Sequence, residues 1–223
     1  MIPGLPHVIN VVFIILTLLT IGIFYKAGRS RTSFVILLFW ISVQAIVSLS
    51  GFYLTEDSIP PRMALLAGPA LLFIIGLFTT QSGRRFLDSL DLRTLTGLHT
   101  IRIVVELELY WLYRHHAVPG IMTFAGVNFD IVAGLTAPLM VFIGFRNGQP
   151  RKGLLLGWNI LCLLLLVNIV SVAVLSAPTP LQQFAFEQPD VAILYFPYTW
   201  LPCCVVPVVL LSHLAAIRKL TRA

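Results

Sequence analysis

The sequence predicts an all-α membrane protein: one integral domain, residues 1–223, folded as a bundle of seven transmembrane helices. Hydrophobic residues make up 58% of the chain and charged residues only 11%, a balance that few soluble domains show. The apolar residues also gather in runs of about 20, the length that a helix needs to cross a bilayer. The net charge of +6 does not indicate nucleic-acid binding, because the basic residues are dispersed among short loops.

Seven apolar segments are candidate spans, and polar or basic residues bound each of them. Their approximate limits in chain order are 8–25, 34–54, 63–80, 98–113, 121–145, 154–176 and 193–217. The connection 81–97 mixes apolar and charged residues in a pattern typical of a short amphipathic helix at the membrane surface. Pro138, Pro202 and Pro207 lie inside spans, where each removes a backbone donor and is predicted to free a carbonyl for other partners.

The basic residues predict the orientation of these spans. They follow the odd-numbered segments, as Lys26, Arg29 and Arg31 follow the first segment and Arg218, Lys219 and Arg222 follow the seventh. Positive loops stay on the cytoplasmic side, so the N-terminus is predicted outside and the C-terminus in the cytoplasm. The first segment lacks a basic leader and a small-residue cleavage site, which indicates a retained span rather than a signal peptide. The plasma (inner) membrane is the expected location.

The hairpin from His99 to Asp130 carries the strongest functional signal. Arg102, Glu106, Glu108 and Asp130 lie in runs that are otherwise apolar enough to cross a bilayer. Each such group costs about 2.5–3.5 kcal/mol to insert, so ionisable residues in spans usually face the bundle interior and mark function. The sequence therefore predicts a buried charged site between the fourth and fifth spans.

Helical spacing predicts how these side chains are directed. At about 100° per residue, Arg102, Glu106 and Tyr110 share one stripe with His99. Glu108 falls on the opposite face and is expected to reach the headgroups near the outer end. In the fifth span, small residues share the helix face of Asp130, which predicts close packing against the fourth span; they are Thr123, Gly126, Gly134 and Ala137.

Counting outward from the turn at 116–118 predicts two contacts across the hairpin. Glu106 lies level with Asn128, and Arg102 lies about two residues deeper than Asp130. An Arg102–Asp130 ion pair and a Glu106–Asn128 hydrogen bond are both within reach, and an Arg102–Glu106 pair along one helix is an alternative. One guanidinium faces three carboxyls, so either a carboxyl holds a proton or a cation sits among them.

The remaining polar residues give weaker signals. Asn159 is an inward candidate in the sixth span, as are Gln44, Asn168 and Thr199 in other spans. His99 and His213 are expected near the cytoplasmic interface. No metal site is predicted. His115 and His116 are weak candidates, because consecutive histidines point in different directions and a site would need ligands from several outer loops, whose acids are Glu56, Asp57, Glu187 and Asp190.

Three classes of function remain open. The first is a membrane protein that binds or translocates a small solute, an ion or a proton through Arg102, Glu106, Asp130 and Asn128. The second is a membrane-embedded enzyme in which a buried carboxyl acts as acid or base on a lipophilic substrate. The third is a non-catalytic subunit or assembly factor. No cofactor is expected, the bilayer is the expected partner, and the oligomeric state stays open.

Overall fold

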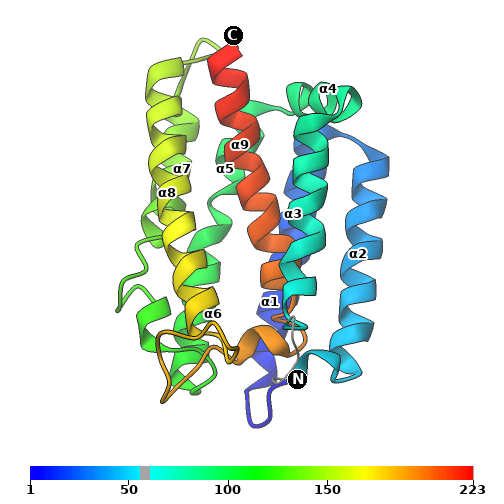
Figure 1. The fold of residues 1–223 in the computed structure, drawn as a ribbon. Coiled ribbons are helices and arrows are strands. Elements are labelled where there is room, and N and C mark those ends of the chain that lie inside the picture. The colour runs from blue at the N-terminus through cyan, green and yellow to red at the C-terminus, as the bar shows by residue number, and fades with distance from the viewer. Residues whose placement is uncertain (56–60, 223) are drawn as a thin grey trace.

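The computed structural model describes residues 1–55 and 61–222 and is almost entirely helical (Figure 1). Its nine α-helices in the described residues are α1 (His7–Gly28), α2 (Arg31–Leu49), α3 (Ala64–Thr79), α4 (Gln81–Ser89), α5 (Leu92–Leu98), α6 (Ile101–Arg114), α7 (Ile131–Ile143), α8 (Lys152–Ser176) and α9 (Val206–Arg222). Two short strands, β1 (Phe145–Arg146) and β2 (Gln149–Pro150), form an antiparallel turn between α7 and α8. The all-α prediction is confirmed.

Four helical segments in the described chain are long and apolar enough to cross a membrane: α1, α2, α8 and the continuous helix Leu201–Arg222. A fifth is possible if α3 and α4, which meet at a bend of 93°, count as one broken span. Helix α7 is apolar but has only 13 residues. The chain is therefore built to reside in a membrane, with four or five spans identified by length and composition.

The fifth predicted span is only partly helical, so the prediction of one helix over 121–145 is wrong. Helix α7 begins at Ile131, and the stretch before it consists of turns. The Thr123 hydroxyl donates to the Gly120 carbonyl, and the Asn128 side-chain oxygen accepts from the Asp130 amide two residues on. Such local bonds compete with helix formation. The predicted stripe of small residues therefore does not extend N-terminal of α7.

The seventh predicted span begins about eight residues later than expected. Residues 193–200 are mostly turns, and the continuous helix starts with a π-helical turn, Leu201–Val205. Pro207 has no amide N–H to offer the Cys203 carbonyl, which instead accepts from the Trp40 indole nitrogen at 2.9 Å. The prediction that proline frees a carbonyl is confirmed at this position, and the bond ties α2 to the start of the last helix.

The predicted amphipathic helix is present as α4, at the end of the bundle that also holds the C-terminus (Figure 1). The Thr80 hydroxyl caps it by accepting from the Gly83 amide at 3.2 Å. The predicted fourth span, 98–113, corresponds to α6, which begins at Ile101 after a break at His99 and Thr100, and α5 lies in the predicted connection before it.

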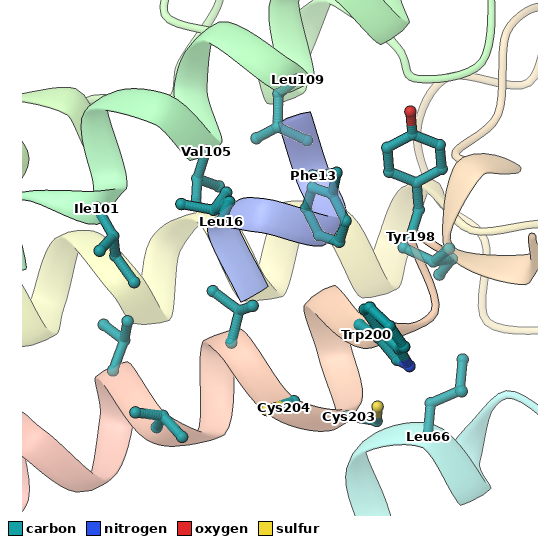
Figure 2. Packing of buried hydrophobic residues seen from close by; sticks show 14 of the residues in the cluster. Phe13, Leu16, Leu66, Ile101, Val105, Leu109, Tyr198, Trp200, Cys203 and Cys204 are labelled. Carbon is teal, nitrogen blue, oxygen red and sulfur yellow. The ribbon is translucent and has the colours of Figure 1, made fainter. Parts of the chain in front are cut away.

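The core brings distant parts of the chain against α6. Figure 2 shows Ile101, Val105 and Leu109 of α6 beside Phe13 and Leu16 of α1, within one apolar cluster. On the other side of α6, Gly134 of α7 lies so close that an added Cβ would be 2.8 Å from the Ile103 amide nitrogen. Helices α6 and α7 therefore pack almost backbone to backbone, as small residues permit in membranes.

Candidate functional site

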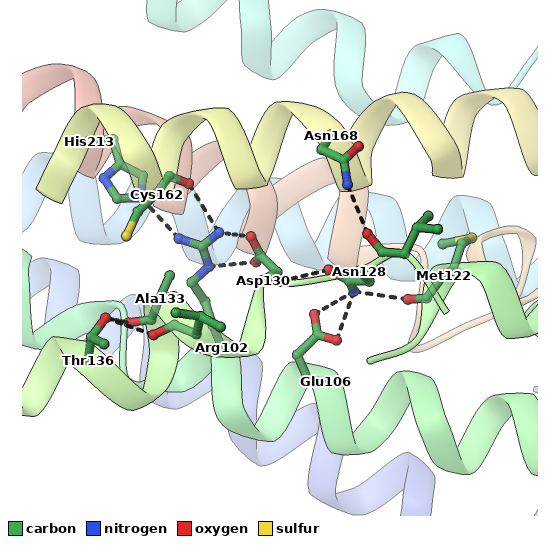
Figure 3. A network of polar contacts seen from close by, with 12 residues as sticks. Arg102, Glu106, Met122, Asn128, Asp130, Ala133, Thr136, Cys162, Asn168 and His213 are labelled. Atoms are coloured by element: carbon green, nitrogen blue, oxygen red, sulfur yellow. Dashed lines mark hydrogen bonds and ion pairs between the residues drawn. The ribbon is translucent and has the colours of Figure 1, made fainter. Parts of the chain in front are cut away.

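A buried ion pair joins the two sides of the hairpin. The Arg102 side chain of α6 is 1% exposed, and its Nε donates to Asp130 Oδ2 at 2.5 Å while its Nη2 pairs with Oδ1 (Figure 3). Asp130 is the residue immediately before α7, so the tight packing of α6 and α7 holds the pair together. The ion pair predicted from the sequence is present.

The other guanidinium donors of Arg102 reach α8 and α9. Its Nη2 donates to the Cys162 carbonyl at 3.3 Å, and its Nη1 lies 3.1 Å from His213 Nε2. A guanidinium can only donate, so Nε2 of His213 is the acceptor and its proton is on Nδ1. That Nδ1 lies 2.9 Å from the Asn159 side-chain oxygen, which accepts its proton. His213 is therefore neutral and links Arg102 to Asn159.

Asn128 connects the ion pair to Glu106. Its side-chain nitrogen lies 2.7 Å from both carboxylate oxygens of Glu106 and also donates to the Met122 carbonyl at 2.9 Å. Its side-chain oxygen accepts from the Asp130 amide at 3.0 Å. The predicted Glu106–Asn128 hydrogen bond is thus present, whereas no hydrogen bond forms between Arg102 and Glu106, the alternative that the sequence allowed.

The charges in this site do not cancel. Arg102 neutralises Asp130, and among the described residues the only group that donates to Glu106 is the neutral amide of Asn128. Glu106 is 1% exposed, so solvent does not compensate its charge. A buried carboxylate without a cation is costly, which makes Glu106 the chemically most distinctive residue of the site.

Glu108 lies on the opposite face of α6, as predicted, but not at the headgroups. It is 1% exposed, and neither of its carboxylate oxygens has a hydrogen-bond partner among the described residues. It lines a small cavity of about 10 Å³ with Phe13 and Tyr198. The expectation of an exposed Glu108 is wrong because α1 and the segment that carries Tyr198 cover this end of α6.

The same small cavity is lined by Asp190, which the sequence placed among the outer-loop acids near His115 and His116. Asp190 is completely buried in the long connection between α8 and α9. Burial raises the pKa of its carboxyl from 3.8 to about 7, against the opposing effect of the backbone N–H groups of Ile193 and Ala192. Its amide donates to the Ser176 carbonyl at 2.9 Å, which fixes the start of this connection at the end of α8.

Two histidines expected at the interface are instead in the core. His99 and His213 are both 0% exposed, and their rings stack with centroids 3.8 Å apart. Trp158 meets His99 edge to face at 5.5 Å. Neither ring nitrogen of His99 has a partner among the described residues. Two features of the sequence could have indicated this burial. His99 shares the helix stripe of Arg102, and His213 lies within a largely apolar segment.

The other candidates lie outside this network. Tyr110 stacks on Phe124 with ring centroids 5.0 Å apart. His115 and His116 are exposed, and Glu56 and Asp57 lie outside the described residues. In the part of the chain that the structure describes, no three His, Cys, Asp or Glu side chains gather as a metal site.

The inward polar candidates have local roles. Gln44 accepts from the Tyr53 hydroxyl at 2.6 Å, and Asn168 donates to the Val127 carbonyl at 3.1 Å. Thr199 is completely buried, and its hydroxyl has no partner among the described residues.

The fold and site define a helical, multi-pass membrane protein with a buried charge network at its centre. The family model for the domain of unknown function DUF8737 matches residues 59–221, and the chain belongs to this family. The matched region contains every residue of the network. Neither a curated protein nor a solved structure matches the chain.

Proposed function

We propose that this protein binds a proton at Glu106 and passes it through the bundle, as part of proton or proton-coupled transport across the plasma (inner) membrane. In this proposal the chain crosses the bilayer seven times, with its N-terminus outside and its C-terminus in the cytoplasm. Arg102 and Asp130 hold α6 and α7 together, and Glu106 and Asn128 form the exchangeable part of the site.

The arrangement of the shorter helices supports seven crossings. The helical stretch α5–α6 runs along the bundle beside the long helices, and so does α7 with the turns before it (Figure 1). Irregular backbone is tolerated at membrane depth where protein surrounds it. The polar side chains of the 120–130 turns meet this condition, because Thr123 and Asn128 are at most 1% exposed.

The observation that carries the proposal is that Glu106 is buried with a neutral partner only. A carboxyl in that setting either holds a proton or attracts a cation. The Asn128 amide donates to the carboxylate oxygens and leaves lone pairs for a proton. Because Asn128 also binds the Asp130 amide, a change of charge on Glu106 acts directly on the start of α7.

Buried titratable groups flank Glu106 in the chain, with Glu108 on the opposite face of α6. His99, which stacks on His213, lies toward one end, and Glu108 lies toward the other. Nine residue steps separate His99, just before α6, from Glu108, which at helical spacing is about 14 Å. This length is about half of the hydrocarbon core, so a proton entering at one end would need few further steps.

The experiment is proton flux into vesicles that contain the purified protein and a pH-sensitive dye, driven by an imposed potassium potential. We expect acidification with the wild-type protein and none with Glu106→Gln, which keeps the size of the side chain. Glu187→Gln is the matched control, because Glu187 is exposed on the outer connection. Equal flux in wild-type and Glu106→Gln vesicles would contradict the proposal.

A second candidate is a non-catalytic subunit or assembly factor of a membrane complex. It is favoured by one observation: the Arg102 network ties α6, α8, α9 and the start of α7 together by bonds between residues of the chain itself. Under this proposal Glu106→Gln leaves every flux unchanged, and the wild-type protein co-purifies with another membrane protein from its own host.

A further inference from the structure

A second site lies on the opposite side of the bundle, between α2 and α3. A cavity of about 370 Å³ opens there, with an almost wholly apolar lining. Its walls are Ile36 of α2 and Phe73 of α3, and Pro207 of α9 lies at its base. The volume is in the range of small-molecule sites, which are about 300–1,000 Å³. We infer that this groove binds one acyl chain of an anionic phospholipid from the surrounding bilayer.

The groove is open toward the lipid. Helix α2 packs on α1 and on the π-helical turn but stands apart from α3 (Figure 1). The side chains at the mouth remain exposed, with Ile36 at 44% and Phe73 at 53%. Trp40 forms part of the wall, and its bond to the Cys203 carbonyl holds the indole in place. A chain can therefore enter from the side without leaving the bilayer.

The length of the groove matches one leaflet. Its lining runs from Ser30, the residue that caps α2, to Trp40 in α2, ten residue steps or about 15 Å at helical spacing. The hydrocarbon core of a bilayer is about 30 Å thick, so this distance is about the depth of one leaflet. An acyl chain that fills the groove would therefore place its headgroup at the Ser30 end.

That end is polar and basic. Ser30, Thr32 and Ser33 line it, and the exposed side chains of Arg29 and Arg31 lie in the same turn between α1 and α2. The cytoplasmic leaflet carries anionic lipids, and each Lys or Arg at its surface adds about 1 kcal/mol of attraction. This end is the one that positive loops predict to be cytoplasmic.

Helix α4 adds further cations at the same end. The Asp91 amide donates to the Ala27 carbonyl at 2.9 Å, which holds the α4–α5 segment against the end of α1. Phe86 of α4 lines the groove, and the exposed Arg85 precedes it in the chain. Arg84 is held by the end of α3, where its Nη1 donates to the Thr79 carbonyl at 3.0 Å. The acidic neighbours are already engaged: Asp88 pairs with Arg218, and Asp91 accepts from the Thr94 amide. A phosphate at the groove end would therefore meet arginines without competing carboxylates.

The test is quenching of Trp40 fluorescence by phospholipids with brominated acyl chains. Trp111 is 39% exposed, so the protein carries Trp111→Phe, and the spectrum of the same protein with Trp40→Phe is subtracted. Vesicles contain either brominated phosphatidylglycerol or brominated phosphatidylcholine. We expect phosphatidylglycerol to quench Trp40 at lower mole fraction, and Arg31→Gln or Arg85→Gln each to weaken that preference about five-fold.

Filling the groove gives the second arm. Ala70→Phe adds a ring to the wall of the groove and should abolish the quenching of Trp40. Leu72 lies on the same helix but is 70% exposed and does not line the groove, so Leu72→Phe should leave the quenching intact. Equal quenching by the two lipids, in wild type and in the arginine variants, would overturn the inference even if Ala70→Phe failed to fold. A change of oligomeric state in Ala70→Phe without a change in quenching would assign the groove to a second copy of the chain instead.

Discussion

Arg102 of α6 and His213 of α9 meet at 3.1 Å, and this contact joins the last helix of the chain to the charge network. The guanidinium fixes the tautomer of the imidazole, and the imidazole in turn fixes the Asn159 amide of α8. His213 has no charge to contribute in this state. Its role is to accept a hydrogen bond from the buried Arg102 guanidinium, so replacing it should lower the stability of the protein.

His213→Leu should lower the stability of the protein by about 1–3 kcal/mol, because it leaves a guanidinium N–H and the Asn159 oxygen buried without partners. His213→Gln offers a carbonyl acceptor and should be milder. The melting temperature in detergent is the measurement, with the exposed His7→Ala as the control. A His213→Leu protein as stable as the His7→Ala protein would show that the contact does not contribute.

Breaking the Arg102–Asp130 pair on one side should be more costly than breaking it on both. Arg102→Gln or Asp130→Asn alone should each cost about 3–5 kcal/mol, because the remaining charge stays buried and unpaired. The double variant should lose less than either single variant, because it leaves no buried charge unpaired. Thermal unfolding of the four proteins gives this coupling, and additivity of the single losses would contradict the pairing.

The Asp88–Arg218 pair is the internal comparison for that cycle. It has similar hydrogen-bond geometry, with distances of 2.7 and 2.9 Å, but the Asp88 side chain is 46% exposed. An exposed pair contributes little to stability, because water and salt screen both charges. Asp88→Asn should therefore change the melting temperature little, and its effect should weaken further in high salt.

Gly134→Ala should force α6 and α7 apart. The added Cβ would lie 2.8 Å from the Ile103 amide nitrogen and 3.2 Å from the Arg102 carbonyl carbon, and the backbone there cannot turn away. We expect a loss of about 1–3 kcal/mol. Gly157→Ala in α8, where an added Cβ meets nothing within 4 Å, should be neutral or stabilising in the same unfolding assay.

The Asp190 carboxyl predicts a pH dependence of stability. Its pKa is about 7 in the folded chain and 3.8 in the reference state, so between these values the folded chain holds a proton that the unfolded chain has lost. Stability should therefore fall as the pH rises from about 4 to 7, by about 4 kcal/mol in total, and level off above that. Asp190→Asn should remove this slope from melting curves recorded between pH 5 and pH 8. An unchanged slope would assign it to other groups.

The sequence predicted the partners in the site better than it predicted the backbone that carries them. The pairing of Arg102 with Asp130, and of Glu106 with Asn128, follows from counting outward from the turn at 116–118. The count assumed two helices, but the second half of the hairpin consists of turns up to Asp130. The Thr123 and Asn128 side chains favour turns over helix here, because they form hydrogen bonds with the nearby backbone.

Burial at the ends of the bundle was the part that the sequence did not predict. Glu108, His99 and His213 were expected near headgroups because of their distance from the span centres. Glu108 is buried because Phe13 of α1 and Tyr198 in the connection before α9 cover it, and His99 and His213 are buried because they stack on each other beside Trp158. Such coverage depends on how loops pack, and hydropathy in a single sequence does not report it.

The most direct test of the account is the protonation of Glu106 in the membrane. Infrared difference spectra between acidic and alkaline pH, recorded on the protein in lipid, report the carbonyl band of a protonated carboxylic acid. We expect such a band in the wild-type protein, a shift of that band in heavy water, and its loss in Glu106→Gln but not in Glu187→Gln. A band that persists unchanged in Glu106→Gln would contradict the assignment of the exchangeable proton to Glu106.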